Sequence, residues 1–253
     1  MTDSQVGTFV WRELMTPDTA KSVRFYGELC GWNITPIDMG PGQEPYQLVH
    51  REKGSRDIGG IMKTGPGMPA AWCSYVGVED VDATSASANS AGGKVLKEPS
   101  DIPNVGRFSV LADPDGAVFV AFKGSMPRPV DGSAGDRPKL GDFCWEQLSA
   151  GSIEKANAFY TKVLGWRAEQ GGDGLGPVFH MGERMIASAM PTQPGVPPNW
   201  MTFVVVDDLS GANARVTRLG GSVLMPRIEV PGMGAFSVIK DDVGAVIGLF
   251  VSA

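Results

Sequence analysis

Bulky and polar side chains alternate over Thr8–Leu14, and this period of two predicts a strand with one buried face. A helix is expected to follow, since Pro17 is tolerated in a first helical turn and Asp18 can cap it. Two further strands are predicted at Tyr46–Arg51 and Ile58–Met62. The same order of elements begins again near the third tryptophan, so each half of the chain is expected to hold two βαβββ modules.

The second half of the chain predicts the same first helix. Apolar side chains recur there at the spacing of one buried helix face, at Ala156, Phe159, Tyr160, Val163 and Leu164. Glycine is expected to end the first helix of each half, at Gly31 and at Gly165. A tryptophan then opens the next strand in both halves.

The six tryptophans fall into three matched pairs between the two halves. WRELMTPDTAKSVRFYGELCGW aligns without a gap to WEQLSAGSIEKANAFYTKVLGW, and GRFSVLADPDGAVFVAF aligns to GAFSVIKDDVGAVIGLF. This match identifies an internal repeat. The segment between the copies is rich in Pro, Gly and charge and has no apolar periodicity, which is typical of a linker. The predicted organisation is a domain over 7–124, a linker over 125–140 and a second domain over 141–252.

Several motifs follow one another in a fixed order: a helix ending in FYGELCGW or FYTKVLGW, a V-x-D turn before the second helix, and DPDGA before the last strand. In this order the chain resembles the vicinal-oxygen-chelate superfamily, which contains glyoxalases, bleomycin-resistance proteins and extradiol dioxygenases. The stretch EPSDIPNVGRFSVLADPDGAVFVAFK resembles the two-domain glyoxalase-like family of a mycobacterial culture-filtrate antigen. The resemblance implies an α+β fold with tandem domains, each made of two βαβββ modules that form a cup-shaped mixed sheet.

Metal-dependent members of that superfamily hold a divalent ion with His or Glu side chains from four strands of the cup. The resemblance places the corresponding positions at Trp11 and Trp145, Cys73 and Met201, Val120 and Gly248, and within Ile58–Met62 and Ile186–Met190. Neither domain has the expected donors, because only Cys73 in this set could coordinate an ion. We therefore expect no metal and no other cofactor.

Glu13 is the candidate catalytic residue. Alternation along the first strand places it on the same face as Trp11, toward the expected cup, where a carboxylate can act as a general acid or base. The alternative is a structural role, in which Glu13 pairs with an arginine or caps a backbone amide. Its repeat partner Gln147 cannot transfer protons at neutral pH, so the first domain is the expected reactive half.

Aromatic side chains are expected to line the binding site. Trp11 and Trp145 would replace a metal site with an apolar stacking wall. The other predicted ligand-binding residues are Cys73, Tyr75, Phe122, Gln147, Phe203 and the two histidines, His50 and His180. Aligning Gly54 with Gly182 places both histidines on one face of the third strand, two positions apart. They are either ligand contacts or ordinary strand-edge residues.

Composition narrows the range of partners. The net charge is −6 and no run of Lys or Arg occurs, which disfavours nucleic acid and anionic membranes as partners. No targeting or membrane-spanning segment is evident, so a cytoplasmic location is expected, with non-classical export left open. The three cysteines are too few and too scattered for a disulfide framework. We expect a small-molecule ligand and either a monomer with two packed domains or a weak homodimer.

Two functions follow from these observations. The first is a glyoxalase-like lyase or isomerase that acts on a small carbonyl compound with proton transfer by Glu13. The second is a non-catalytic, metal-independent binder of an aromatic or hydrophobic small molecule. The family resemblance favours the enzyme, whereas the unfilled ligand positions favour the binder.

Overall fold

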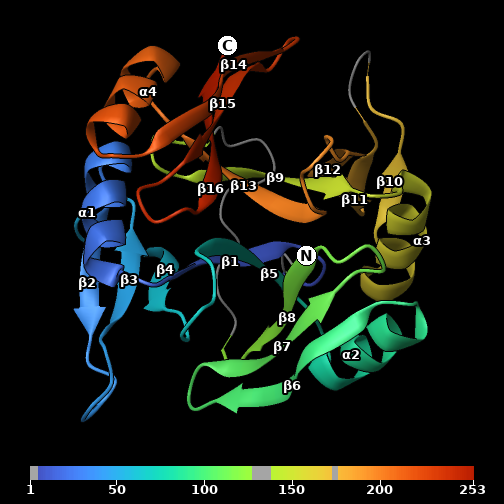
Figure 1. Cartoon of the computed structure of the whole chain (residues 1–253). Helices are drawn as coiled ribbons and strands as arrows, with labels where there is room; N and C mark the ends of the chain where they lie inside the picture. The colour runs from blue at the N-terminus through green and yellow to red at the C-terminus, as the bar shows by residue number, and fades with distance from the viewer. Residues whose placement is uncertain (1–4, 127–137, 173–175) are drawn as a thin grey trace. The chain divides into compact units, whose positions relative to one another are not determined.

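The computed structural model describes residues 5–126, 138–172 and 176–253. Its elements follow the βαβββ order four times (Figure 1). The first repeat contains β1 (Phe9–Thr16), α1 (Thr19–Cys30), β2 (Asn33–Ile37), β3 (Tyr46–His50), β4 (Asp57–Lys63), β5 (Ala71–Gly77), α2 (Val81–Ser90), β6 (Lys94–Ile102), β7 (Gly106–Ala112) and β8 (Val118–Gly124). The second repeat contains β9 (Phe143–Ala150), α3 (Ile153–Leu164), β10 (Arg167–Glu169), β11 (Val178–Met181), β12 (Arg184–Pro191), β13 (Asn199–Val205), α4 (Leu209–Arg218), β14 (Ser222–Val230), β15 (Gly234–Lys240) and β16 (Val246–Ser252).

The strands form two mixed eight-stranded sheets with the same internal order. The orders are β2-β3-β4-β1-β5-β8-β7-β6 and β10-β11-β12-β9-β13-β16-β15-β14. In every module the first strand pairs in parallel with the last, and the remaining pairs within the modules are antiparallel. The predicted α+β fold of tandem βαβββ modules is confirmed. Most of the predicted linker, at 127–137, lies outside the described residues.

The helices begin and end where the sequence predicts. The Asp18 side chain accepts a hydrogen bond from the Lys21 amide, 3.0 Å away, at the start of α1. Gly31 and Gly165 follow α1 and α3 in the left-handed conformation, with φ of 70° at both positions. Glycine adopts this conformation without the steric cost that a Cβ atom imposes.

Each compact unit of the structure combines segments of both repeats. Among the described residues, one unit consists of residues 5–10, 73–126, 146–172 and 176–200, and the other consists of residues 11–72, 138–145 and 201–253. In the first of these units α2 lies beside α3, and in the second α1 lies beside α4 (Figure 1). Each hydrophobic core likewise draws buried side chains from both repeats.

A buried tyrosine hydroxyl joins distant segments in each core. The Tyr26 hydroxyl donates to Asp241 Oδ2 at 3.0 Å and accepts a hydrogen bond from Trp72 Nε1 at 2.9 Å. Tyr160 repeats this arrangement in the other unit, where it donates to Asp113 Oδ2 at 3.1 Å and accepts from Trp200 Nε1 at 2.8 Å.

Indole donors add a second link of the same kind within each unit. Trp32 Nε1 donates to the Gly141 carbonyl, and Trp166 Nε1 donates to the Gly7 carbonyl, both at 2.8 Å. Each tryptophan therefore holds the segment that leads into the first strand of the other repeat. Among the described residues, no helix has the length and apolar character needed to cross a membrane.

We predict that two of the four tyrosines resist ionisation in the native protein. Burial raises the pKa of Tyr26 and Tyr160 well above its ordinary value, and the charges of Asp241 and Asp113 raise it further. A raised folded-state pKa stabilises the protein at pH below the unfolded value of about 10, and this contribution is lost as pH rises further. An alkaline titration followed by phenolate absorbance should show at most two tyrosines ionising before unfolding. Four tyrosines ionising while the circular dichroism remains native would contradict this.

Candidate functional site

Alternation along β1 places Glu13 and Trp11 on the face that points away from α1. Leu14 is fully buried in the core beneath the helix, so its neighbour Glu13 lies on the opposite side of the strand. Glu13 is nevertheless only 7% exposed, whereas Trp11 is half-buried. A carboxylate buried to this degree requires hydrogen-bonding partners.

Tyr46, at the start of β3, supplies one such partner. Its hydroxyl donates to Glu13 Oε1 at 2.7 Å and accepts a hydrogen bond from Trp11 Nε1 at 3.2 Å. Tyr46 is not among the predicted site residues, because 33 positions separate it from Glu13 and their contact depends on the strand order. The structure thus brings together the predicted pair, Trp11 and Glu13, through a third side chain.

Gly60 makes room for the tyrosine. It lies opposite Glu13 in the parallel ladder between β1 and β4. A Cβ atom on Gly60 would lie 1.8 Å from the Tyr46 hydroxyl oxygen, which is far inside van der Waals contact. The short side chain at this position is therefore required for Tyr46 to reach Glu13.

The second repeat has the equivalent strand, β9, but different side chains at the positions of Glu13 and Gly60. Trp145 and Gln147 are half-buried and occupy β9, and Gln147 lies opposite Ser188 of β12 as Glu13 lies opposite Gly60. A serine side chain thus occupies the position that glycine leaves open in the first repeat.

Aromatic side chains line the corresponding face of the second module in each repeat. The Tyr75 and Phe122 rings, predicted as ligand-binding, meet edge to face with centroids 5.9 Å apart. Their neighbours Val76 and Ala121 are fully buried in the core, so both aromatic rings lie on the face away from α2. Cys73 precedes them on β5 and is half-buried.

Phe203 occupies the equivalent strand of the second repeat. Its ring contacts Phe236 edge to face at 5.3 Å, and its carbonyl oxygen accepts a hydrogen bond from the Cys144 thiol at 3.6 Å. A Cβ atom on Gly248 would lie 2.2 Å from the Phe203 ring, so the ring fills the space above that glycine. The resemblance had implied a metal-ligand position at Gly248, which an aromatic ring covers instead.

The histidines make only local contacts in the described residues. His50 Nδ1 lies 3.0 Å from the Ser55 carbonyl and Nε2 lies 3.0 Å from the Thr35 hydroxyl, whereas His180 Nε2 lies 3.5 Å from Glu169 Oε2. The two-position offset expected between them is wrong. His50 pairs with Asn33, and His180 pairs with Arg167, the residue equivalent to Asn33. Alignment on the turn glycines misplaced them because the turns that follow differ in length.

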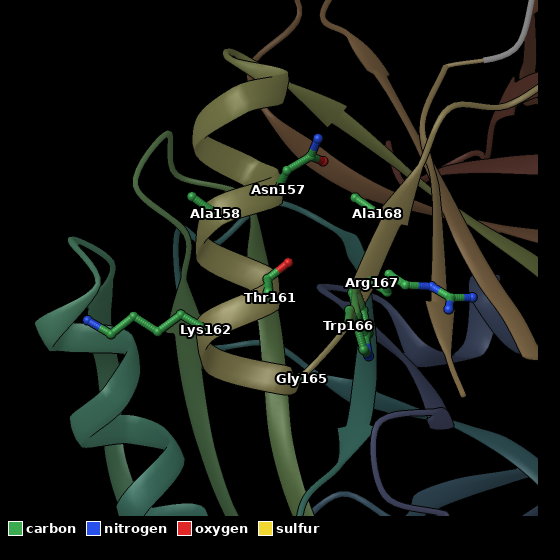
Figure 2. A pocket seen from close by; sticks show the side chains of 8 residues that line it. All are labelled: Asn157, Ala158, Thr161, Lys162, Gly165, Trp166, Arg167 and Ala168. Atoms are coloured by element: carbon green, nitrogen blue, oxygen red, sulfur yellow. The ribbon is translucent and has the colours of Figure 1, made fainter. Parts of the chain in front are cut away.

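A solvent-facing hollow of about 620 Å³ lies along the end of α3 and the start of β10 (Figure 2). Its lining includes Asn157, Thr161, Lys162 and Arg167, and none of the predicted site residues. Lys162 reaches the Ser90 carbonyl at 3.3 Å, and Arg167 pairs with Glu169 at 3.1 Å. Lys162 and Arg167 are thus already paired with protein oxygen atoms, so the hollow does not present them as ligands for a bound anion.

The positions at which the family resemblance implies metal ligands do not suit a divalent ion. Trp11 presents an indole N–H, which can only donate a hydrogen bond, and Val120 offers no donor atom. Hard divalent ions need oxygen or imidazole ligands. Within the described ranges, no group of three or more His, Cys, Asp or Glu side chains could hold an ion.

The sequence matches known proteins along most of its length. The family model described as the Glyoxalase/Bleomycin resistance protein/Dioxygenase superfamily matches residues 8–120 and 145–249. CFP32 of Mycobacterium tuberculosis, to which a glyoxylase activity is provisionally assigned, is 29% identical over 98% of this chain and 95% of its own length. The anthracycline biosynthesis protein DauV of Streptomyces sp. (strain C5) is 31% identical over 91% of this chain and 88% of its own length.

Solved structures show the same fold. The Mn(II)-bound glyoxalase from Novosphingobium aromaticivorans superposes with a TM-score of 0.64 at 18% identity, over 97% of this chain and 82% of that one. The 2,3-dioxygenase LapB from Pseudomonas sp. KL28 gives a TM-score of 0.61 at 14% identity, over 99% and 94% of the two chains. At these identities the likeness concerns the fold.

We predict that Gly248→Ala destabilises the protein, because the added methyl group collides with the Phe203 ring. The expected loss is about 1–3 kcal/mol of unfolding free energy, as for an overpacked core. Gly27→Ala is the matched control, since its Cβ would meet nothing closer than 3.8 Å and alanine is the better helix former. Urea denaturation of both variants measures the difference. Equal stability of Gly248→Ala and the wild type would show that the ring moves aside without cost.

Proposed function

Because the chain belongs to the Glyoxalase/Bleomycin resistance protein/Dioxygenase superfamily, we propose that it is a lyase or isomerase of small carbonyl compounds, with proton transfer by Glu13. The observation that carries this proposal is the buried Glu13 carboxylate held by the Tyr46 hydroxyl at 2.7 Å. Buried carboxylates with fixed hydrogen-bond partners are suited to general acid–base chemistry.

The proposed reaction is a proton shift next to a carbonyl group. Glu13 removes a proton from the carbon beside the carbonyl, and the electron pair of the broken C–H bond moves into the enolate. In an isomerisation, the carboxylic acid then returns the proton to a neighbouring atom. In a lyase reaction, the enolate expels a leaving group with its electron pair, and the carboxylic acid gives its proton to that group. Neither route changes the oxidation state overall, so no oxidant or reductant is consumed.

The same side chains suit a planar substrate. Trp11 lies one alternation away from Glu13 on β1 and offers an indole surface for stacking. The carbonyl compound would lie against this ring, with its acidic carbon within reach of the Glu13 carboxylate. His50, in contrast, contacts the Thr35 hydroxyl and the Ser55 carbonyl, and no step is assigned to it.

We further propose that the protein binds its ligand without a divalent metal. Support comes from the residues at the family's ligand positions. Indole, thiol, thioether and aliphatic side chains and a glycine covered by an aromatic ring stand there in place of carboxylate and imidazole donors. Stabilisation of an enolate would then fall to polar side chains near Glu13.

A second candidate function is sequestration of an aromatic compound without turnover. The half-buried Phe122 and Phe236 with their edge-to-face partners Tyr75 and Phe203 favour it, since such aromatic surfaces suit flat apolar ligands. One relative is named for anthracycline biosynthesis, which suggests an anthracycline as the first probe of binding.

We predict that Glu13→Gln abolishes most proton-transfer activity. Isomerisation of the hemithioacetal of methylglyoxal is the assay, and kcat should fall by about 10²–10⁴-fold when the general base is removed. Glu28→Gln is the control, because it neutralises an exposed carboxylate on α1 and should leave kcat unchanged.

Full activity of Glu13→Gln in this assay would reject the assigned role. Binding of an anthracycline with quenched tryptophan fluorescence, and no turnover of the hemithioacetal by the wild type, would favour sequestration instead.

We predict that activity and folding survive removal of divalent metals. Elemental analysis of the purified protein should find no stoichiometric transition metal, and dialysis against a chelator should leave kcat and the thermal midpoint unchanged. The reason is that isolated donors in a solvent-accessible site bind such ions weakly. Tightly held manganese, nickel, zinc or iron, with activity lost on chelation and restored on refilling, would return the protein to a metal-dependent mechanism.

A further inference from the structure

The donor and the acceptor are fixed in the two hydrogen bonds that link Trp11, Tyr46 and Glu13. An indole N–H can only donate, so the Tyr46 oxygen must accept the bond from Trp11 at 3.2 Å. The single hydroxyl hydrogen of Tyr46 is then directed to Glu13 Oε1 at 2.7 Å. Oε1 is therefore an acceptor, and a hydrogen bond of this kind favours the ionised carboxylate.

We propose that Tyr46 is the positioning residue that orients the Glu13 carboxylate to take the first proton from the substrate, and that only the first repeat carries this device. The proposal rests on the proposed function for the reaction itself. Tyr46 acts through Glu13 and exchanges no proton with the substrate.

The space around Tyr46 is matched to this role. Its hydroxyl lies over Gly60, the residue opposite Glu13 in the β1–β4 ladder, and a Cβ there would come within 1.8 Å of the hydroxyl oxygen. Gly60 has no unusual φ, so the backbone does not itself require glycine. The glycine is explained by the tyrosine side chain that passes over it.

The second repeat changes all three positions together. Gln147 and Ser188 replace Glu13 and Gly60 in the equivalent ladder. His180 is equivalent to His50 by register, and counting back four residues from each places Gly176 at the position of Tyr46. Without the tyrosine there is no hydroxyl to orient a carboxylate, and without the glycine there is no room for one.

The first test uses Tyr46→Phe, Glu13→Gln and the double variant in the hemithioacetal isomerisation assay. Tyr46→Phe should lower kcat about 10- to 100-fold with KM nearly unchanged, less than the roughly 10²–10⁴-fold loss expected for the base itself. The double variant should be no slower than Glu13→Gln alone, because Tyr46 acts only through Glu13. Losses that multiply, or a change confined to KM, would overturn the proposal.

The second test detects the hydrogen bond between Trp11 and Tyr46 by NMR and needs no enzymatic turnover. In protein labelled with ¹⁵N at tryptophan, the Trp11 indole resonance is assigned from its loss in Trp11→Phe. Tyr46→Phe should move this resonance upfield, while the other five indoles serve as internal controls. Gly60→Ala should do the same, since its methyl group displaces the hydroxyl. An unchanged chemical shift of the Trp11 indole resonance in both variants would overturn the proposal.

The two tests separate the failure of this proposal from that of the proposed function. A wild type that does not convert the hemithioacetal, with an indole resonance that responds as expected, would reject the carbonyl reaction and retain Tyr46 as the group that orients Glu13. Turnover by the wild type with no effect of Tyr46→Phe on either measurement would retain the reaction and reject the positioning role.

Discussion

A phenol hydroxyl buried among apolar side chains needs hydrogen-bond partners, and in each core one tyrosine hydroxyl both donates and accepts a hydrogen bond. The Tyr26 hydroxyl donates a hydrogen bond to Asp241 and accepts one from Trp72, and both residues lie far from it in the sequence. Leaving a buried polar group unsatisfied costs about 1–3 kcal/mol, a large share of the stability of a folded domain. The network therefore restricts α1, the start of β5 and the turn before β16 to one arrangement.

These hydrogen bonds also explain why each compact unit draws on both repeats. Asp241 belongs to the second repeat and Tyr26 to the first, while Asp113 and Tyr160 reverse those origins. Either repeat alone would contain a buried tyrosine without its carboxylate. Asp241 in turn accepts backbone hydrogen bonds from Val243 and Ala245, so the same side chain also shapes the turn that leads into β16.

Local sequence features were enough to predict the elements and their order. Helix caps such as Asp18, glycine stops such as Gly31 and alternation along the strands act within a few residues, and the structure confirms them. The contact between Glu13 and Tyr46 could not be predicted in this way, because it depends on β4 lying between β1 and β3. The equivalence of the histidines was also missed, since register is set by strand pairing and not by the turn glycines.

The two repeats agree where the core requires it and differ on the face that carries Glu13. The tyrosine, tryptophan and aspartate of the buried network recur in both copies, because each core buries a tyrosine hydroxyl that needs the same two hydrogen-bond partners. Glu13, Tyr46 and Gly60 are not members of the two hydrophobic cores, so the cores do not require these positions to match between the repeats. They differ as a set because the tyrosine needs both the glycine beneath it and an acceptor for its proton. A repeated scaffold can in this way differ in the side chains of one face while both copies contribute buried side chains to each core.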